Sequence, residues 1–213
     1  GVLSNPFMGP HKLGSMGCIS AHPDPAIERP VVRVIDEDGQ DLPMGEVGEL
    51  AVKTPTLMQG YFKDPEQTAA SFKDGWFLTG DLVRRDADDF LFFFTRKKDI
   101  IRRRGENISG AEIDSAIGSH PDILECASVG VASDLGEEEI LLAVVPRPGT
   151  TITPEVVHAY AKVHLSPIKR PRYIVMVDSL PHTGSMKIAK FRLKPADNLR
   201  RQATDFSSKE VQP

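Results

Sequence analysis

The sequence predicts two parts of different fold class, a mainly β part over residues 1–95 and a small α+β domain over residues 99–213. The first part contains short strand-like runs separated by turn residues, whereas the second alternates between helical and strand patterns. The charge also changes sign between them. Residues 1–95 carry 8 basic and 15 acidic side chains, a net charge of −7, and residues 96–213 carry 18 and 15, a net charge of +3. This asymmetry indicates two units with different roles.

The first part begins with a loop and continues with pairs of strands. Residues 1–30 are rich in Gly, Pro and Ser and are expected to be irregular. Apolar, β-branched runs predict strands at 31–35 and 49–53, with the "DEDG" at 36–39 as a turn. The acidic "DADD" turn then joins two further predicted strands, 82–85 and 90–94.

One helix is predicted between these strand pairs. Asp64 suits the N-cap position and Pro65 suits the first helical position. Gln67 stands three residues after Asp64 and can complete a capping box with it. The helix is therefore expected to start at residue 65.

The second part predicts the order helix, strand, strand, helix, strand. Ser109 and Glu112 form a capping box that opens a helix ending before His120-Pro121. We therefore expect flanking helices on a central sheet of about three strands, at residues 123–131, 140–145 and 173–177.

The second helix of this part is predicted to start at Thr153-Pro154 and to end before Pro167. One face of this helix should be buried, the face formed by Val156, Val157, Tyr160 and Ala161. Residues from about 197 onward are polar, and we expect them to be disordered.

Composition points to an ordinary folded protein. The net charge of −4 gives no global signal for nucleic acid or membranes. Cys18 and Cys126 lack any metal-binding spacing, so reduced thiols and no metal site are expected. We find no apolar run long enough to span a membrane and no signal peptide, which predicts a cytoplasmic location. The loop-like start at Gly1 indicates a piece cut from a longer protein, with a processed or tagged chain as the alternative.

Thr79-Gly80-Asp81 places a carboxylate beside a predicted strand. A carboxylate held in this way can accept hydrogen bonds from two vicinal hydroxyls, as acidic residues do with ribose in dinucleotide-binding folds. The alternative is an aspartate that bonds its own backbone in a turn.

Six of the nine residues from Arg96 to Arg104 are basic. They could bind phosphates or a nucleic-acid backbone, which would make the chain a non-catalytic binding module, or they could be ordinary solvated charges. Ile100 and Ile101 would face opposite sides of a strand, so the basic residues cannot form one flat patch. This disfavours nucleic-acid binding.

Two loop residues complete the set of candidates. Gly105 permits a positive φ or a close backbone approach, although an ordinary turn would also explain it. Lys187 lies on a Thr-Gly-Ser-rich loop that could bring an ammonium to a phosphate or a carboxylate. Taken alone, it is one lysine among many.

The order of these features is far more specific than any one of them. Thr79-Gly80-Asp81, then "TRKKDIIRRRGENIS", then "LPHTGSMKI" resembles the acyl-adenylate-forming superfamily of AMP-dependent synthetases and ligases. This superfamily includes acyl-CoA synthetases, adenylation domains of peptide synthetases and beetle luciferases. The resemblance runs from about Leu3 to Lys194 and includes "GEVGELAVKTPTLMQGYFKDPEQ".

The resemblance implies a role for each matching residue. Asp81 would hold the ribose hydroxyls of ATP, with Arg96 beside it at the nucleotide. Lys98 would be the pivot of a hinge at residues 96–98. Gly105 would line the entry of the CoA pantetheine arm, and Lys187 would contact the α-phosphate and the carboxylate during adenylation.

The resemblance also implies the architecture and the reaction. Residues 1–95 would be the β-rich, barrel-like end of a large N-terminal domain, and residues 99–213 a mobile C-terminal domain. The enzyme would convert a carboxylic acid and ATP to an acyl-adenylate, and then to an acyl-CoA thioester. ATP and Mg²⁺ would be held mainly by the missing N-terminal part, so the fragment alone should be inactive. Nucleic acid would not be a partner, and the oligomeric state cannot be read.

Two positions depart from the family pattern. Met186 stands where glycine is usual, which should stiffen the lysine loop, and Asn107 stands where many relatives carry arginine. The "GENIS" variant looks like the carnitine/crotonobetaine-CoA ligase-like branch and some fatty-acyl-CoA ligases. A peptide-synthetase adenylation domain is the neighbouring alternative, although the chain has no room for a carrier domain.

Overall fold

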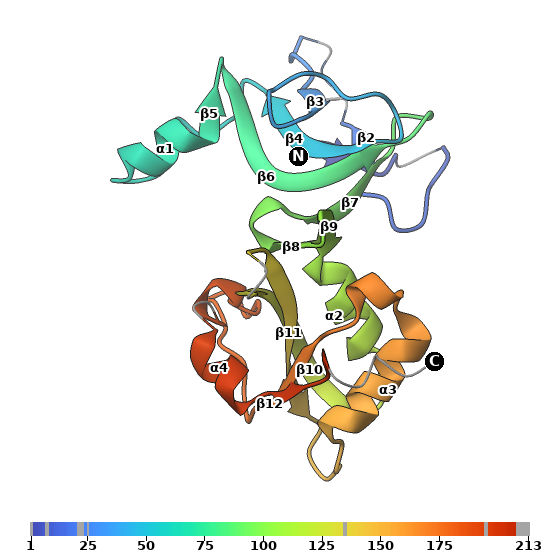
Figure 1. Cartoon of the computed structure of the whole chain (residues 1–213). Helices are drawn as coiled ribbons and strands as arrows, with labels where there is room; N and C mark the ends of the chain where they lie inside the picture. Colours follow the sequence, from blue (N-terminus) through green and yellow to red (C-terminus); the bar gives the residue numbers. More distant parts are fainter. Residues whose placement is uncertain are drawn as a thin grey trace. The chain divides into compact units, whose positions relative to one another are not determined.

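The computed structural model describes residues 2–6, 9–20, 24, 26–133, 136–193 and 196–207. The chain divides into two compact units, Gly1–Lys98 and Asp99–Pro213, each built on its own sheet (Figure 1). The division falls within a short 3-10 helix, η1 (Lys97–Asp99), next to the predicted hinge. Movement at this point stays a prediction.

The first unit contains a five-stranded antiparallel sheet in which the long strand β6 (Trp76–Arg85) is central. One side of β6 pairs with β4, which in turn pairs with β3. The other side pairs first with β5 and then with β7. The remaining strands are β1 (Leu3–Ser4), β2 (Cys18–Ile19), β3 (Val31–Ile35), β4 (Val47–Lys53), β5 (Phe72–Lys73) and β7 (Leu91–Arg96). The expected barrel-like closure stays a prediction.

The helix of this unit, α1 (Pro65–Ser71), starts where the sequence predicts. Asp64 Oδ1 accepts a hydrogen bond from the Gln67 backbone N–H at 2.9 Å, which confirms the cap. The reciprocal half of the capping box is wrong. The Gln67 side chain donates to Ser71 Oγ at 3.1 Å, and the Asp64 N–H instead donates to the Tyr61 carbonyl.

The second unit is a small α+β domain, which confirms the predicted class and the predicted order of helices and strands. Its main sheet has the strand order β10-β11-β12-β13, with only β11 and β12 parallel. A separate hairpin precedes it. The elements are β8 (Ile100–Arg103), β9 (Glu106–Ser109), α2 (Gly110–Gly118), β10 (Ile123–Ala132), β11 (Glu138–Pro146), α3 (Pro154–His164), η2 (Pro167–Lys169), β12 (Tyr173–Met176), η3 (Lys190–Leu193), α4 (Asp197–Gln202) and β13 (Thr204–Asp205).

The expectation of disorder from about residue 197 is wrong for the described part of the tail. Helix α4 forms there, and β13 adds a fourth strand to the sheet beside β12. Phe206 explains the difference, because its ring is 2 % exposed and stacks on His158 with ring centroids 4.1 Å apart. Leu199 and Ala203 add to this anchor, because both pack against the second hydrophobic cluster of the unit. Residues 208–213 lie outside the described residues.

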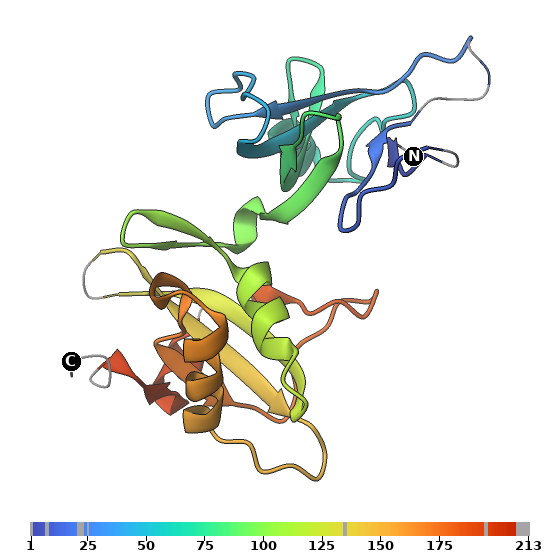
Figure 2. The ribbon, with the colours of Figure 1, turned by 90° about the vertical axis from the view of Figure 1, so that its right-hand side faces the viewer.

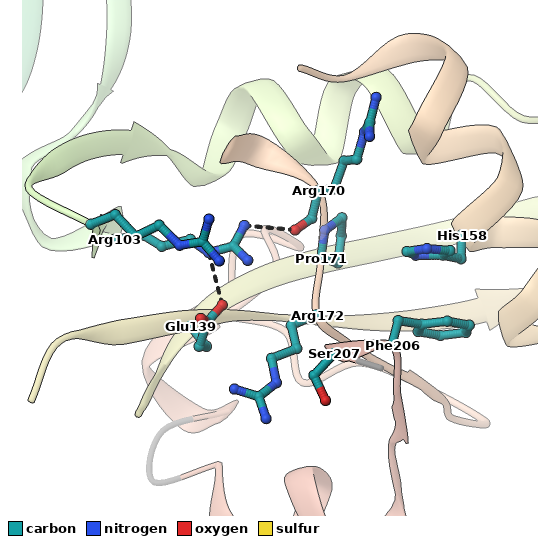
Figure 3. Close-up of a pocket in the computed structure, with 9 residues that line it drawn as sticks. Arg103, Glu139, His158, Arg170, Pro171, Arg172, Phe206 and Ser207 are labelled. Atoms are coloured by element: carbon teal, nitrogen blue, oxygen red, sulfur yellow. Dashed lines mark hydrogen bonds and ion pairs between the residues drawn. The ribbon is translucent and has the colours of Figure 1, made fainter. Parts of the chain in front are cut away.

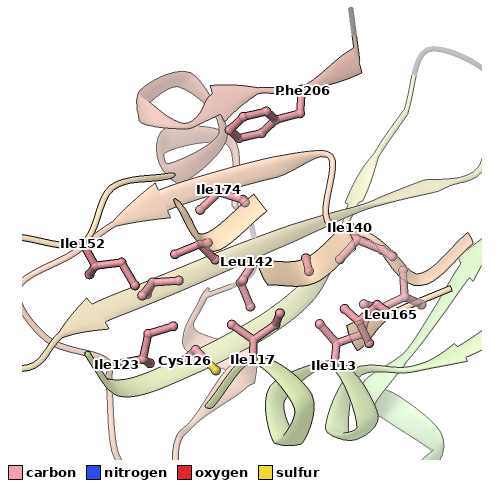
Figure 4. Packing of buried hydrophobic residues seen from close by; sticks show 14 of the residues in the cluster. Ile113, Ile117, Ile123, Cys126, Ile140, Leu142, Ile152, Leu165, Ile174 and Phe206 are labelled. Carbon is pink, nitrogen blue, oxygen red and sulfur yellow. The ribbon is translucent and has the colours of Figure 1, made fainter. Parts of the chain in front are cut away.

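Alternate residues of the central strands point to opposite faces of the sheet, and both faces are buried. Ile140, Leu142 and Val144 of β11 face α2 and α3 (Figure 4). The intervening residues of β11 face a second cluster that includes Leu180, Leu193 and Ala196. The prediction for α3 is only partly right, since Val157 and Ala161 are buried, Tyr160 is half-buried and Val156 is 45 % exposed.

Candidate functional site

Asp81 and Arg96 lie opposite each other on neighbouring strands of the first unit, β6 and β7. Arg96 Nε is 2.6 Å from Asp81 Oδ1, and Arg96 Nη1 donates to the Thr79 carbonyl at 3.2 Å. The Asp81 side chain is 17 % exposed and that of Arg96 is 49 % exposed. The strand register therefore brings together the two residues predicted to meet the nucleotide.

A β-bulge sets the direction of Asp81. Between the paired positions Glu49↔Leu82 and Ala51↔Leu78, the single residue Leu50 stands opposite three residues, Thr79, Gly80 and Asp81. Gly80 adopts a φ of +70°, which its missing side chain permits. Bulges of this kind redirect a side chain out of the regular ladder. The Thr79 hydroxyl fixes the distortion, because it donates to the Leu50 carbonyl at 2.8 Å and accepts from the Asp81 N–H at 3.1 Å.

Sequence reasoning missed Glu49 as a part of this site. Its side chain is only 8 % exposed. Oε1 accepts the Gly80 N–H at 3.1 Å, and Oε2 lies 2.8 Å from Lys97 Nζ. One buried carboxylate thus links the bulge to the residue that precedes Lys98. Only the pairing of β4 with β6 reveals this, because Glu49 is remote in sequence from both partners.

A pocket of about 530 Å³ adjoins the bulge. Lys98, whose predicted role is that of a pivot, is exposed and contributes to its wall. The lining is mostly polar and includes Gln67, Thr79, Gly80, Arg96 and Lys97, with Tyr61 beside them. Glu49 also lines the pocket and pairs with Lys97. The remaining cations and the hydroxyls of this wall suit a ligand that carries phosphate and hydroxyl groups.

Gly105 occupies the tip of the β8–β9 hairpin in the second unit. Arg104 and Gly105 form the two-residue turn with φ values of +52° and +77°, the pattern of a type I′ turn. A Cβ atom on Gly105 would meet no atom within 4 Å, so the backbone angle and not space requires glycine here. The Gly105 N–H donates to the Glu137 carboxylate at 3.1 Å. Asn107, the departure noted above, accepts from Arg102 Nε at 3.3 Å.

The basic residues of this hairpin do not form one patch, as the sequence predicted. Arg103 is buried and its Nε lies 2.8 Å from Glu139 Oε2, with both side chains less than 10 % exposed (Figure 3). Its Nη1 donates to the carbonyls of Ile168 and Arg170 at 2.7 and 3.0 Å. Arg103 thus holds the segment before β12 against the hairpin, beside a small pocket of about 80 Å³.

Lys187 is exposed in the loop between β12 and η3. The loop is closed by hydrogen bonds from the Thr183 N–H to the Lys187 carbonyl at 2.8 Å, and from the Lys187 N–H to Thr183 Oγ1 at 3.3 Å. Met186 adopts a φ of +62°, a conformation that costs non-glycine residues about 1–2 kcal/mol. The methionine therefore occupies a backbone conformation that favours glycine.

The predicted site residues thus divide between the two units. Asp81, Arg96 and Lys98 belong to the first unit. Gly105 and Lys187 belong to the second, where the hairpin and the loop after β12 extend in opposite directions from the start of α2 (Figure 2). Among the described residues we find no group of three His, Cys, Asp or Glu side chains that could hold a metal ion. No helix in the described ranges is long and apolar enough to cross a membrane.

Comparisons with known proteins agree with the sequence motifs. Residues 112–187 match the family model of the AMP-binding enzyme C-terminal domain. The oxalate–CoA ligase of Arabidopsis thaliana is 37 % identical over 194 residues, which are 89 % of this chain and 36 % of that protein. The feruloyl-CoA synthase of an Amycolatopsis species is 36 % identical over 179 residues, 84 % of this chain and 35 % of that protein.

Solved structures give the same result. ATP-bound MatB from Rhodopseudomonas palustris superposes with a TM-score of 0.78 at 32 % identity, covering 91 % of this chain and 38 % of MatB. The chain therefore spans a little more than a third of the length of these relatives. The resemblance to the AMP-dependent synthetases and ligases that the motifs predicted is confirmed.

Proposed function

We propose that this chain, which carries the C-terminal domain of AMP-binding enzymes, forms the C-terminal portion of an ATP-dependent acid–thiol ligase. The intact enzyme would convert a carboxylic acid and ATP to an acyl-adenylate and pyrophosphate, and would then transfer the acyl group to CoA. The names of the relatives support CoA as the acceptor, because they are CoA ligases and CoA synthases.

One observation carries the proposal for the first half-reaction. The ion pair of Asp81 and Arg96 lies at a fixed bulge beside a polar, cationic pocket. We assign Asp81 to the ribose hydroxyls of the nucleotide and Arg96 to the neighbouring phosphate or ribose oxygens. Both side chains stand on paired strands, so little conformational freedom is lost when the nucleotide binds.

Lys187 supplies the mobile charge in this proposal. Its ammonium, placed near the α-phosphate and the carboxylate, would stabilise the negative charge that develops during adenylation. Gly105 serves the second half-reaction by lining the path of the CoA thiol. The two residues lie on separate loops of one unit, so a rotation at residues 96–98 would exchange them at one site. The Mg²⁺ that this family uses with ATP would be held mainly outside this chain.

A binding module for nucleic acid is the weaker alternative. Arg96 is paired with Asp81, Lys97 with Glu49 and the buried Arg103 with Glu139, so three of the six cations in the basic run already have acidic partners. A nucleic-acid site would show a steep loss of affinity with rising salt, which the ligase proposal does not expect.

The proposal can be tested in a chimera. The whole 213-residue chain replaces the matching segment of the feruloyl-CoA synthase, and feruloyl-CoA formation is followed by its absorbance. We expect turnover from the chimera and none from the truncated synthase or from this chain alone. Failure of a folded chimera, or robust ATP–pyrophosphate exchange by this chain alone, would contradict the proposal.

Three variants of the chimera assign the roles. Asp81→Asn should raise the KM for ATP by ~10-fold or more, because a hydrogen bond to a charged group is lost. Lys187→Ala should slow adenylation by roughly 100-fold while transfer from supplied feruloyl-adenylate to CoA changes little. Lys98→Pro should impair the CoA step more than adenylation, because proline restricts the pivot. Equal losses in both half-reactions would contradict these roles.

A further inference from the structure

A buried ion pair lies at the base of the loop that carries Lys187. Lys190 of η3 places its Nζ 2.5 Å from Asp114 Oδ2 of α2. The two side chains are only 15 % and 20 % exposed. No sequence motif singled out either residue, and neither lies on the wall of the two pockets described above.

The second oxygen of Asp114 is also occupied. Asp114 Oδ1 accepts the Ser128 backbone N–H at 2.6 Å and lies 2.7 Å from Ser128 Oγ. The carboxylate thus joins α2, β10 and η3 at one point. Burial raises the pKa of Asp114, while the Lys190 ammonium and the Ser128 hydrogen bonds favour its charged form. Removal of Lys190 would leave a buried carboxylate with no cation beside it.

The backbone next to Lys190 is fixed as well. Ala189 is 2 % exposed, and its N–H donates to the Pro181 carbonyl at 2.7 Å. His182 and Ile188 form a β-bridge across the neck of the loop. His182 Nε2 also lies 2.9 Å from Glu125 Oε1 of β10. The exposed tip with Lys187 therefore stands on a neck that is held on both sides.

We infer that Asp114 and Lys190 are positioning residues for Lys187. The inference rests on the proposed function of Lys187. Lys190 stands three positions after Lys187, at most about 10 Å of extended chain, so an anchor at Lys190 limits where the Lys187 backbone can lie. Displacement of a catalytic group by about 1 Å can cost ~100-fold in rate, which makes a fixed base valuable. Asp114 and Lys190 would act through the loop and not through a contact with the substrate.

The test uses the chimera with Asp114→Asn, Lys190→Met and the double variant. Each single change should lower adenylation by ~10-fold or more and leave transfer from supplied feruloyl-adenylate within about two-fold. The double variant distinguishes a loss of loop positioning from a loss of protein stability. It leaves no buried charge unpaired, so its urea midpoint should exceed that of Lys190→Met, while its adenylation stays low.

Glu112→Gln is the matched control, because Glu112 lies on the same helix and pairs with Lys169 at 2.6 Å, away from the loop. It should leave both half-reactions unchanged. The inference would be overturned if the double variant recovered adenylation together with stability. It would also be overturned if the single variants lost adenylation and acyl transfer equally. Lys187→Ala is measured in parallel. If Lys187→Ala leaves adenylation unchanged, the proposed role of Lys187 fails. If Lys187→Ala slows adenylation but the Asp114 and Lys190 variants do not, only this inference fails.

Discussion

The two units bury their sheets in different ways. In the first unit, β3, β4, β6 and β7 contribute to one hydrophobic cluster. In the second, β10, β11 and β12 contribute to two clusters, one on each face of the sheet. A sheet covered on both faces removes more apolar surface from water, which is the main favourable term in folding.

The two units also hold their predicted site residues in different ways. Asp81 and Arg96 stand on strands, where register and a bulge fix them directly. Gly105 lies in the β8–β9 turn and Lys187 in the loop after β12, and both extend from the hydrophobic core of the second unit. Groups on strands suit a site that stays constant through a reaction, and groups on loops suit one that changes between steps.

The largest expected effect tests whether the second core is independent of the first unit. Leu142→Ala removes a fully buried side chain and should lower the free energy of unfolding of the second unit by about 3 kcal/mol. Trp76, the single tryptophan, lies in β6 of the first unit and reports only on that unit. Urea unfolding should therefore show a shifted circular-dichroism transition and an unchanged tryptophan-fluorescence curve.

Leu50→Ala in the first unit is the reciprocal control and should shift the fluorescence curve instead. If either variant moves both curves together, the two units unfold as one cooperative body and the comparison breaks down.

A smaller effect concerns the backbone of the hairpin tip. Gly105→Ala forces a side chain into a positive φ of +77° and should destabilise the second unit by about 1–2 kcal/mol. Gly118→Ala, in the last turn of α2, should instead stabilise the same unit by up to about 1 kcal/mol, because its added Cβ meets only an ordinary contact with Cys126. Opposite shifts of the circular-dichroism midpoint would support this account, whereas shifts of the same sign would contradict it.

The last test needs no substitution and uses the two free cysteines, one in each unit. Burial raises the pKa of Cys126 to about 12, and the nearby Asp114 charge adds to this. The thiolate fraction of Cys126 should then be on the order of 1,000-fold below that of an ordinary cysteine at pH 8. Mass spectrometry after brief alkylation of the native chain should find the label on Cys18, which is half-buried, and on Cys126 only in urea. Rapid native labelling of Cys126 would indicate that the second core opens readily.

Local signals in the sequence predicted most of the elements. Strand β3 has the predicted bounds, and Ser109 caps α2 by accepting the Glu112 N–H at 3.2 Å. These features depend on neighbours within a few residues, so a single sequence contains them. The reciprocal half of the Asp64 capping box failed locally, whereas the predictions for the tail and for the buried face of α3 failed because of contacts that are distant in the chain. The helical pattern predicted that Val156 is buried on α3, but Val156 is exposed and His158 is buried instead. The ring of Phe206, from the distant tail, stacks on His158 and covers it.

The candidate site shows the same division. The order of the motifs predicted the resemblance to the AMP-dependent synthetases and ligases and selected Asp81, Arg96, Lys98, Gly105 and Lys187, whose individual roles stay predictions. Glu49 and the pair of Asp114 and Lys190 could not be found in this way, since each meets its partners only through strand pairing or helix packing.

The sequence by itself showed the resemblance to the AMP-dependent synthetases and ligases, the division into two parts and the N-caps of α1 and α2, because these depend on residue types and on short spacings. Only the tertiary structure decided that Asp81 and Arg96 form an ion pair at a bulge, that Arg103 is buried, and that Lys190 anchors the Lys187 loop. The reason is physical: a charge is buried only where a partner neutralises it, and that partner comes from a distant part of the chain.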